Sequence, residues 1–199
     1  MHPSPAFRSE DHALMLSLID EIGFGMVFAA TPDGPRVAHV PLLRMGDGAL
    51  HFHLARGNAL TRHLDGVTAL AVINGPDGYV APRWYGEDPN QVPTWNYLAL
   101  EMEGRVRRLD HDGLLAQLTA VSAREEARLP APAWTLDKAS PDYVDRLLAG
   151  IVGFELEVQA WRPTFKLSQN KSAAQREGVI AGLEARGALG LAELMRGLA

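Results

Sequence analysis

Residues 166–172 form a dense polar run between a predicted strand and a predicted helix. The run consists of Lys166, Leu167, Ser168, Gln169, Asn170, Lys171 and Ser172. Ammonium groups donate hydrogen bonds to anions, and side-chain amides both donate and accept. A set of this kind suits a ligand that carries negative charge and polar edges. Lys166, Gln169 and Asn170 are therefore candidate ligand contacts.

Ser172 has a purely structural explanation. Gln175 follows it three residues later, and this spacing fits a capping box for a helix over about 173–186. We therefore assign Ser172 to the start of that helix and not to a ligand.

Three histidines lie on two neighbouring predicted strands. His51 and His53 point to one face of the second strand, and His39 lies on the strand before it. Two histidines at this spacing can hold a metal ion, but no acidic residue occurs between His53 and Asn58 to complete such a site. We expect imidazoles that line a polar pocket or bond within the sheet, and no metal.

The segment Arg56-Gly57-Asn58 ends one predicted strand and begins a predicted short helix. N–H groups at a helix start, close backbone approach at a glycine and an arginine fork together suit a phosphate. Gly57 and Asn58 are equally typical of a simple turn and helix cap. Taken alone, the segment leaves both interpretations open.

Two aromatic residues flank an asparagine at the start of a long predicted strand. Trp95 and Tyr97 share one face of the strand, and Asn96 points to the apolar face together with Leu98. A buried amide needs partners, because leaving it unsatisfied costs about 1–3 kcal/mol. Asn96 is therefore a candidate contact. The aromatic pair could stack on a ligand or only shield the end of a barrel.

The chain lacks the common motifs of nucleophilic and nucleotide chemistry. It contains no Gly-x-Ser-x-Gly, no Walker lysine pattern and no Gly-x-Gly-x-x-Gly after a strand. We therefore expect no protein nucleophile, and a bound cofactor would carry any chemistry that occurs.

Composition excludes several classes of protein. The 199 residues carry a formal net charge of −5 and include no cysteine, which excludes disulfides and thiolate metal sites. No cluster of basic residues has the density typical of a nucleic-acid interface, so we expect no direct nucleic-acid binding. The first residues lack a signal-peptide pattern and no apolar run is long enough for a membrane span, which favours a cytoplasmic protein.

Alternation and turn residues predict an antiparallel sheet with helices at the ends of the chain and between the later strands. Strands are expected at about 24–31, 36–43, 49–55, 67–73, 79–81, 94–109 and 150–161. Helices are expected at about 10–21 (capped by Ser9), 58–63, 111–128, 140–148, 173–186 and 188–198. Turns are expected at 32–34, 46–48 and 75–78, and a long polar loop at 82–93. This pattern favours an α+β fold built on an antiparallel β-barrel, in one domain over residues 1–199.

Five segments together resemble the PaiB family, the FMN-binding negative transcriptional regulators of bacteria. The segments, in family order, are Ala38-His39-Val40-Pro41-Leu42-Leu43, Leu50-His51-Phe52-His53-Leu54-Ala55-Arg56-Gly57-Asn58, Val92-Pro93-Thr94-Trp95-Asn96-Tyr97, Gly150-Ile151-Val152-Gly153-Phe154-Glu155 and Lys166-Leu167-Ser168-Gln169-Asn170-Lys171-Ser172. They span nearly the whole chain, and it is their order that makes the resemblance specific.

The resemblance implies a split β-barrel related to pyridoxamine-phosphate oxidase and to flavin-reductase-like proteins. It also implies a homodimer that holds FMN at the subunit interface, and repression of sporulation and degradative-enzyme genes. Arg56 and Asn58 would then bind the FMN phosphate. His39 and His53 would line the ribityl chain or the ring.

In the same family context, Trp95 and Asn96 would stack on and bond the flavin ring. Lys166, Gln169 and Asn170 would come from the partner subunit or from the barrel rim, with Lys166 near the pyrimidine side of the flavin. The leading hypothesis is a PaiB-like FMN-binding regulator. The alternatives are an FMN-dependent oxidoreductase of a small substrate and a heme-binding split barrel.

Overall fold

The computed structural model describes residues 4–46, 48–87 and 90–197 of the chain. Some residues of predicted elements lie outside these ranges: Asp47 in the turn at 46–48, Asp88 in the loop at 82–93 and Leu198 at the end of the last helix.

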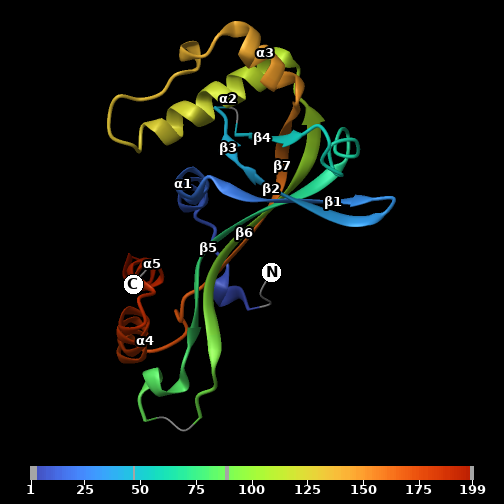
Figure 1. Ribbon diagram of the computed structural model, residues 1–199. Helices are drawn as coiled ribbons and strands as arrows, with labels where there is room; N and C mark the ends of the chain where they lie inside the picture. Colours follow the sequence, from blue (N-terminus) through green and yellow to red (C-terminus); the bar gives the residue numbers. More distant parts are fainter. Residues whose placement is uncertain (1–3, 47, 88–89, 198–199) are drawn as a thin grey trace. The chain divides into compact units, whose positions relative to one another are not determined.

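Within the described residues, seven strands form one sheet with the order β2-β1-β5-β6-β7-β4-β3 (Figure 1). The strands are β1 (Phe24–Thr31), β2 (Gly34–Pro41), β3 (Leu43–Arg44), β4 (Leu50–Ala55), β5 (Thr68–Val80), β6 (Thr94–Arg108) and β7 (Ile151–Lys166). The pairs β1–β2, β1–β5, β3–β4 and β4–β7 are antiparallel. Strands β2 and β4 stand far apart in this order but contact one another, so the sheet curls toward a barrel.

The helices lie at the ends of the chain and between β6 and β7, which confirms the predicted α+β class. They are α1 (His12–Ile22), α2 (His111–Glu126), α3 (Pro141–Ala149), α4 (Ala173–Ala185) and α5 (Leu189–Gly197), with short 3₁₀ helices η1 (Pro5–Phe7), η2 (Pro82–Tyr85) and η3 (Leu136–Lys138). None of these helices is both long and apolar enough to span a membrane, among the residues described.

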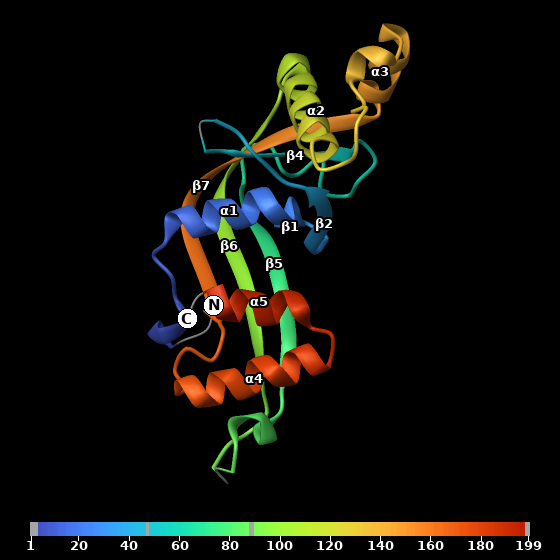
Figure 2. The same ribbon diagram turned by 90° about the vertical axis from the view of Figure 1, so that its left-hand side faces the viewer.

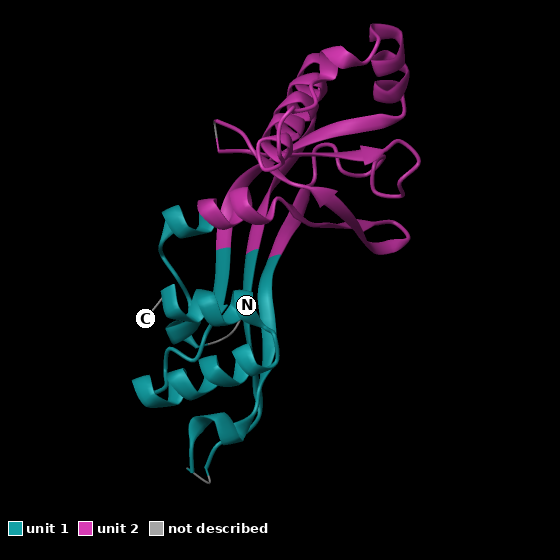
Figure 3. Ribbon diagram, turned by 60° about the vertical axis from the view of Figure 1, so that its left-hand side comes forward, with its two compact units in different colours: residues 1–15, 74–100, 162–199 teal, residues 16–73, 101–161 magenta. Residues whose placement is uncertain are grey.

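The chain divides into two compact units, coloured separately in Figure 3. Unit 1 comprises residues 1–15, 74–100 and 162–199, and unit 2 comprises residues 16–73 and 101–161. Each long strand, β5, β6 and β7, contributes residues to both units. The organisation of residues 1–199 as one domain stays a prediction.

The core of unit 2 forms on the apolar face of β4. Phe52 is opposite Phe154 in the register of β4 and β7, and their rings stack with centroids 5.6 Å apart. Both rings are fully buried. The predicted alternation of β4 is therefore confirmed for its apolar residues. Helix α2 contacts β3 and β4, and covers the face of β4 that carries the histidines.

The core of unit 1 forms where α4 and α5 lie against the strands (Figure 2). A Cβ atom on Gly78 of β5 would lie 3.0 Å from a methyl group of Leu191 and 3.1 Å from one of Leu183. Helix α4 also contacts η2, and a Cβ atom on Gly178 would lie 2.1 Å from the carbonyl oxygen of Trp84. Close packing therefore requires glycine at position 178.

Two predicted boundaries are wrong because packing and pairing extend the strands. The predicted turn at 75–78 lies inside the continuous strand β5, where Gly75 admits the side chain of Leu98 within 3.0 Å of its Cβ position. Strand β7 continues to Lys166 and does not end at Trp161. Lys166 therefore lies on a strand end and not in a loop.

Two predictions near chain turns are also wrong. Residues 58–63 form hydrogen-bonded turns and not a helix, because Asn58 Oδ1 accepts from the Leu60 N–H at 2.9 Å and closes a local turn. Helix α1 begins after Asp11, whose carboxylate accepts from the Leu14 N–H at 3.0 Å, so Asp11 and not Ser9 makes the capping bond. The capping box of Ser172 and Gln175 is confirmed.

Candidate functional site

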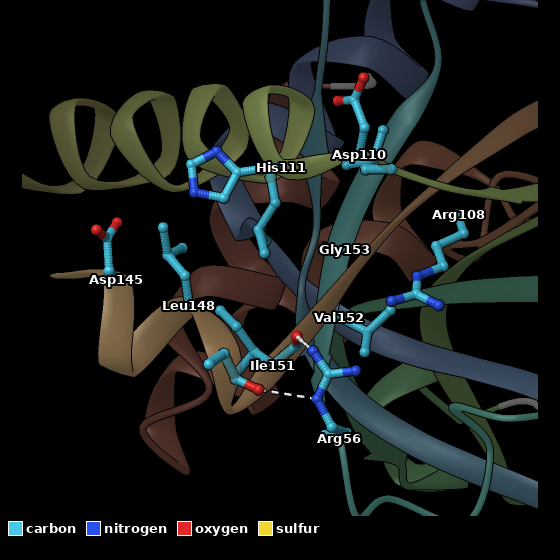
Figure 4. Close-up of a pocket in the computed structure, with 12 residues that line it drawn as sticks. Arg56, Arg108, Asp110, His111, Asp145, Leu148, Ile151, Val152 and Gly153 are labelled. Carbon is cyan, nitrogen blue, oxygen red and sulfur yellow. Dashed lines mark hydrogen bonds between the residues drawn. The ribbon is translucent and has the colours of Figure 1, made fainter.

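Arg56 lies directly after β4 and bonds to three consecutive carbonyl groups at the junction of α3 and β7. Its Nε donates to Ala149 O at 2.8 Å, and its Nη2 donates to Ile151 O at 3.2 Å (Figure 4). Its backbone N–H donates to Gly150 O at 2.8 Å. These bonds satisfy carbonyls at the C-terminus of α3, where a cation is also favourable. Nη1 bonds to none of the described residues and remains able to donate to a ligand.

The arginine pocket is a cavity of about 520 Å³ in unit 2. It lies among the start of α2, the end of α3 and the start of β7, as the close-up in Figure 4 shows. Its lining consists of Arg56, Arg108, Leu109, Asp110, His111, Leu114, Asp145, Leu148, Ala149, Ile151, Val152 and Gly153. The pocket thus combines two guanidinium groups, an apolar wall and two carboxylates. Asp110 is committed to the helix, because its Oδ1 accepts from the Gly113 N–H at 2.8 Å.

Asn58 and Arg56 lie close in sequence, but the side chain of Asn58 stabilises the turn that follows β4. Its Oδ1 accepts from the Leu60 N–H, as described above, so its side-chain oxygen supports local structure. Its Nδ2 bonds to none of the described residues. Contact with a phosphate would therefore come through that nitrogen.

His53 is held by a buried glutamine of α2. The side-chain amide of Gln117 and the Nδ1 of His53 form a hydrogen bond over 3.2 Å, and its direction depends on the tautomer of the imidazole. Burial lowers the pKa of His53, and the bond with Gln117 opposes that shift. Gln117 is fully buried, and none of the described residues donates to its Oε1. Sequence reasoning missed Gln117, because it lies 64 residues away on another element.

The other two histidines occupy different surroundings. His51 is buried, and its Nε2 lies 3.7 Å from a carboxylate oxygen of Glu155, which also bonds to Arg107. His39 is exposed on β2 and lines none of the cavities described here. The structure therefore does not bring His39 and His53 into one pocket. Among described residues, no group of three or more histidine or acidic side chains is placed to hold a metal.

The lysine pocket is a cavity of about 260 Å³ in unit 1. Its lining consists of Phe7, Tyr85, Asn90, Gln91, Val92, Thr94, Asn96, Lys166, Ser168, Asn170 and Lys171. Three predicted contacts, Asn96, Lys166 and Asn170, therefore meet in one pocket although Asn96 precedes the others by about 70 residues. None of the lining residues that the structure describes is acidic.

A buried pair of polar side chains forms one wall of the lysine pocket. Asn96 and Ser168 are only 1% and 3% exposed. Asn96 Nδ2 donates to Ser168 Oγ at 2.9 Å, and the Ser168 hydroxyl lies 3.2 Å from Asn96 Oδ1. Ser168 has a φ of 59°, a left-handed conformation that non-glycine residues rarely adopt outside constrained sites.

Both lysines of the pocket bond to neutral oxygens. Lys166 Nζ donates to Thr94 Oγ1 at 2.6 Å, and Lys171 Nζ donates to Gln91 Oε1 at 2.7 Å. Burial lowers the pKa of Lys166. Lys171 also lies over the ring of Tyr85, with Nζ 4.7 Å from the ring centroid. The contact between Lys171 and Tyr85 was not predicted from the sequence.

Gln169 and Trp95 lie outside the lysine pocket. The Oε1 of Gln169 accepts from the Leu167 N–H at 2.7 Å and its Nε2 donates to Phe165 O, so its amide holds the turn after β7. It lines a neighbouring cavity of unit 1. Trp95 is 52% exposed and forms an edge contact with Tyr79, with centroids 6.4 Å apart. A planar ligand could stack against that open face.

Two solved structures have a fold similar to that of this chain. The structure of the FAD and heme binding protein from Mycobacterium smegmatis is similar to it, with a TM-score of 0.61, 21% identity, and coverage of 88% of this chain and 80% of that chain. The flavocytochrome Anf3 from Azotobacter vinelandii gives a TM-score of 0.62 with 14% identity, over 83% of this chain and 72% of that chain. At these identities the likeness concerns the fold, which is the split barrel that was predicted.

Sequence relatives identify the family. A family model described as "Putative FMN-binding domain" matches residues 1–160. The "Protease synthase and sporulation protein PAI 2" of Bacillus subtilis is 33% identical over 173 residues, which cover 84% of this chain and 82% of the relative. The chain therefore belongs to the PaiB family of FMN-binding proteins, and its cofactor is FMN.

Proposed function

We propose that this protein is a homodimeric, cytoplasmic FMN-binding regulator of the PaiB type, with FMN at the subunit interface. The observation that carries the proposal is the lysine pocket, where Lys166 and Asn170 offer a cation and an amide beside the buried Asn96, and no described lining residue is acidic. Such a set suits the hydrogen-bonding edge of a flavin ring. Trp95 points to the opposite face of β6 from Asn96, so its predicted stacking on the ring is not supported by the lysine pocket.

The arginine pocket of unit 2 offers a separate set of groups, which suits a phosphate. Arg56 Nη1 and the guanidinium of Arg108 suit a dianionic phosphate, and the Nδ2 of Asn58 would add a donor. The assignment of His39 and His53 to the ribityl chain or the ring stays a prediction, because neither histidine lines the arginine pocket or the lysine pocket. When bound, FMN supplies electron-transfer chemistry, and the residues of this chain bind and orient it. The residues present therefore fit the cofactor.

The first test is the absorption spectrum of the purified protein. We expect a yellow protein with flavin absorption and one FMN per subunit in a dimer, measured by light scattering and by flavin release. A colourless protein that also fails to bind added FMN would contradict the proposal. A heme Soret band in place of flavin bands would favour the heme alternative.

A second test asks which subunit supplies Lys166. Arg56→Ala and Lys166→Met proteins would be mixed, dissociated and reassociated, and FMN binding measured. If Lys166 comes from the partner, half of the sites in mixed dimers are intact and FMN binding returns. If Lys166 and Arg56 serve the same site from one subunit, no site in the mixture is intact.

The regulatory role makes a separate prediction. With a net charge of −5 and no dense basic cluster, we expect no specific mobility shift of DNA at physiological salt. Regulation would then act through a partner or a small molecule. Bleaching of the flavin by NAD(P)H would instead favour the second candidate, an FMN-dependent oxidoreductase.

A further inference from the structure

Lys171 is a cation of the lysine pocket that the flavin contacts proposed above do not use. Lys171 is half-buried, and its ammonium group contacts two uncharged groups. These are the Gln91 amide oxygen at 2.7 Å and the face of the Tyr85 ring. Tyr85 itself is buried. These contacts fix the position of the Lys171 ammonium, and no described residue that lines the pocket supplies a counter-charge.

A second ammonium group occupies the same cavity. Lys166 Nζ bonds to Thr94 Oγ1 and lies 5.8 Å from the centroid of the Phe7 ring. Both ammonium groups line one cavity, and burial removes part of the hydration of Lys166. An anionic group placed between them would offset that cost. The lowered pKa of Lys166 is consistent with this desolvation.

The wall of the pocket is neutral and held in place by internal bonds. Asn96 uses its amide nitrogen on Ser168 Oγ and on the sulfur of Met195, and its oxygen faces the Ser168 hydroxyl. Ser168 keeps its left-handed backbone within this arrangement. Residues in such conformations cluster at ligand sites. The wall thus cannot neutralise the lysines, and it shapes a small, preformed cavity.

We propose that Lys171, together with Lys166, binds the oxyanion group of a small organic acid in the lysine pocket. At about 260 Å³ the cavity suits a ligand smaller than a nucleotide. The shared chemistry is a carboxylate or a phosphate group. The position of this anion beside the flavin rests on the proposed function. Under that function, the substrate or effector belongs to the class of small anions. Anion binding itself requires no flavin.

The test is a calorimetric titration of the full-length protein, with and without FMN, at constant ionic strength. The probes are benzoate, succinate and inorganic phosphate, so that carboxylate and phosphate sources are distinguished. We expect one of them to bind, and Lys171→Gln to weaken that binding at least tenfold. Lys138→Gln is the matched control, since Lys138 is an exposed lysine of unit 2 and its loss should change the affinity less than twofold.

A second variant guards against misfolding of the first. Gln91→Glu places a carboxylate at the position that accepts from Lys171, so it supplies an internal counter-ion with little change in shape. We expect this variant to keep the melting temperature of the wild type and to lose anion binding at least tenfold.

The outcomes separate this inference from the proposed function. Anion binding that depends on Lys171 supports the site even if FMN fails to bind, a result that would reject only the proposed function. FMN binding without any anion binding overturns the site, as does anion binding that both variants leave intact. Loss of anion binding when FMN is present would also overturn it as a second-ligand site, because the flavin alone would then fill the pocket.

Discussion

The arginine pocket and the lysine pocket both offer cations to a ligand, but they differ in how those cations are held. Arg56 is tied to backbone carbonyls and lies in a pocket that also contains Asp110 and Asp145. Lys166 and Lys171 bond to neutral side chains, and no acidic residue lines their pocket among those described. The planar guanidinium group of Arg56 suits a phosphate. The partly desolvated ammonium group of Lys166 suits the polar edge of a ring or a small anion. The two pockets are therefore suited to different chemical groups.

The largest effect should come from a substitution that separates α4 from η2, the short helix that carries Tyr85 of the lysine pocket. In Gly178→Ala the new methyl group would lie 2.1 Å from the Trp84 carbonyl oxygen, so η2 and α4 must separate. We expect a loss of about 2–3 kcal/mol in the free energy of unfolding, measured by urea denaturation. The gain from replacing a helical glycine is about 1 kcal/mol and does not compensate.

The control for that substitution is Gly190→Ala in α5. The nearest atom to its Cβ position is a Pro76 carbon at 3.7 Å, which is ordinary contact. We expect its stability to be unchanged or raised by up to about 1 kcal/mol. A Gly178→Ala protein as stable as this control would show that the contact of α4 with η2 is not tight.

The next effect concerns the phosphate. Arg56→Ala should weaken FMN binding by about 2 kcal/mol, or about 30-fold, because a charge-assisted bond is lost. Riboflavin lacks the phosphate, so its affinity should not change. The measurement is quenching of flavin fluorescence for both ligands. Equal losses for FMN and riboflavin would mean that Arg56 acts only by ordering the start of β7.

Lys166→Met should give a smaller effect with the opposite selectivity. We expect FMN and riboflavin to lose about 1 kcal/mol each, or about fivefold, since the contact is with the ring and not with the phosphate. Fluorescence titration of both flavins checks this expectation. A loss confined to FMN would place the phosphate in the lysine pocket and reverse the assignment of the two pockets.

The smallest expected effect is a pH dependence of the stability that arises from His53, a residue of unit 2. The pKa of His53 is lowered from its ordinary value of 6.5 by burial, so the unfolded chain binds the proton more readily than the folded chain. The contribution of His53 to the free energy of unfolding should therefore be fully present above about pH 6.5 and should decrease as the pH falls toward the folded-state pKa. Urea denaturation at pH 5 and pH 8 measures the difference.

The control for this prediction is His53→Asn, which has no group that titrates in this range. The variant should show a weaker decrease in stability between pH 8 and pH 5 than the wild type. An identical decrease in both proteins would assign the pH dependence to other groups.

Local signals explain which parts of the fold were predictable from sequence. Strand β1 begins and ends where predicted, because its alternating apolar residues are followed by a Pro-Asp-Gly turn. The capping box at Ser172 is also encoded within four residues. The segment at 75–78 was predicted wrongly because its glycines respond to leucines of β6, α4 and α5, which are distant in sequence.

The candidate site shows the same limit. Residue type alone marked Asn96 and Lys166, but their meeting in one pocket depends on the start of β6 lying beside the end of β7, which no spacing in the sequence encodes. The left-handed conformation of Ser168 and the bond between His53 and Gln117 are tertiary effects of the same kind. Sequence could nominate some of these side chains, but only the structure shows which of them meet.

The three carbonyls bonded by Arg56 have a further consequence for local motion. Ala149, Gly150 and Ile151 all accept from this one residue, so fraying of the α3 terminus must break the three bonds in a single cooperative opening. The free energy of that opening is then set largely by one side chain. A ligand that draws on the same guanidinium would register as a change in amide hydrogen exchange across residues 147–153, far down the chain from Arg56 itself.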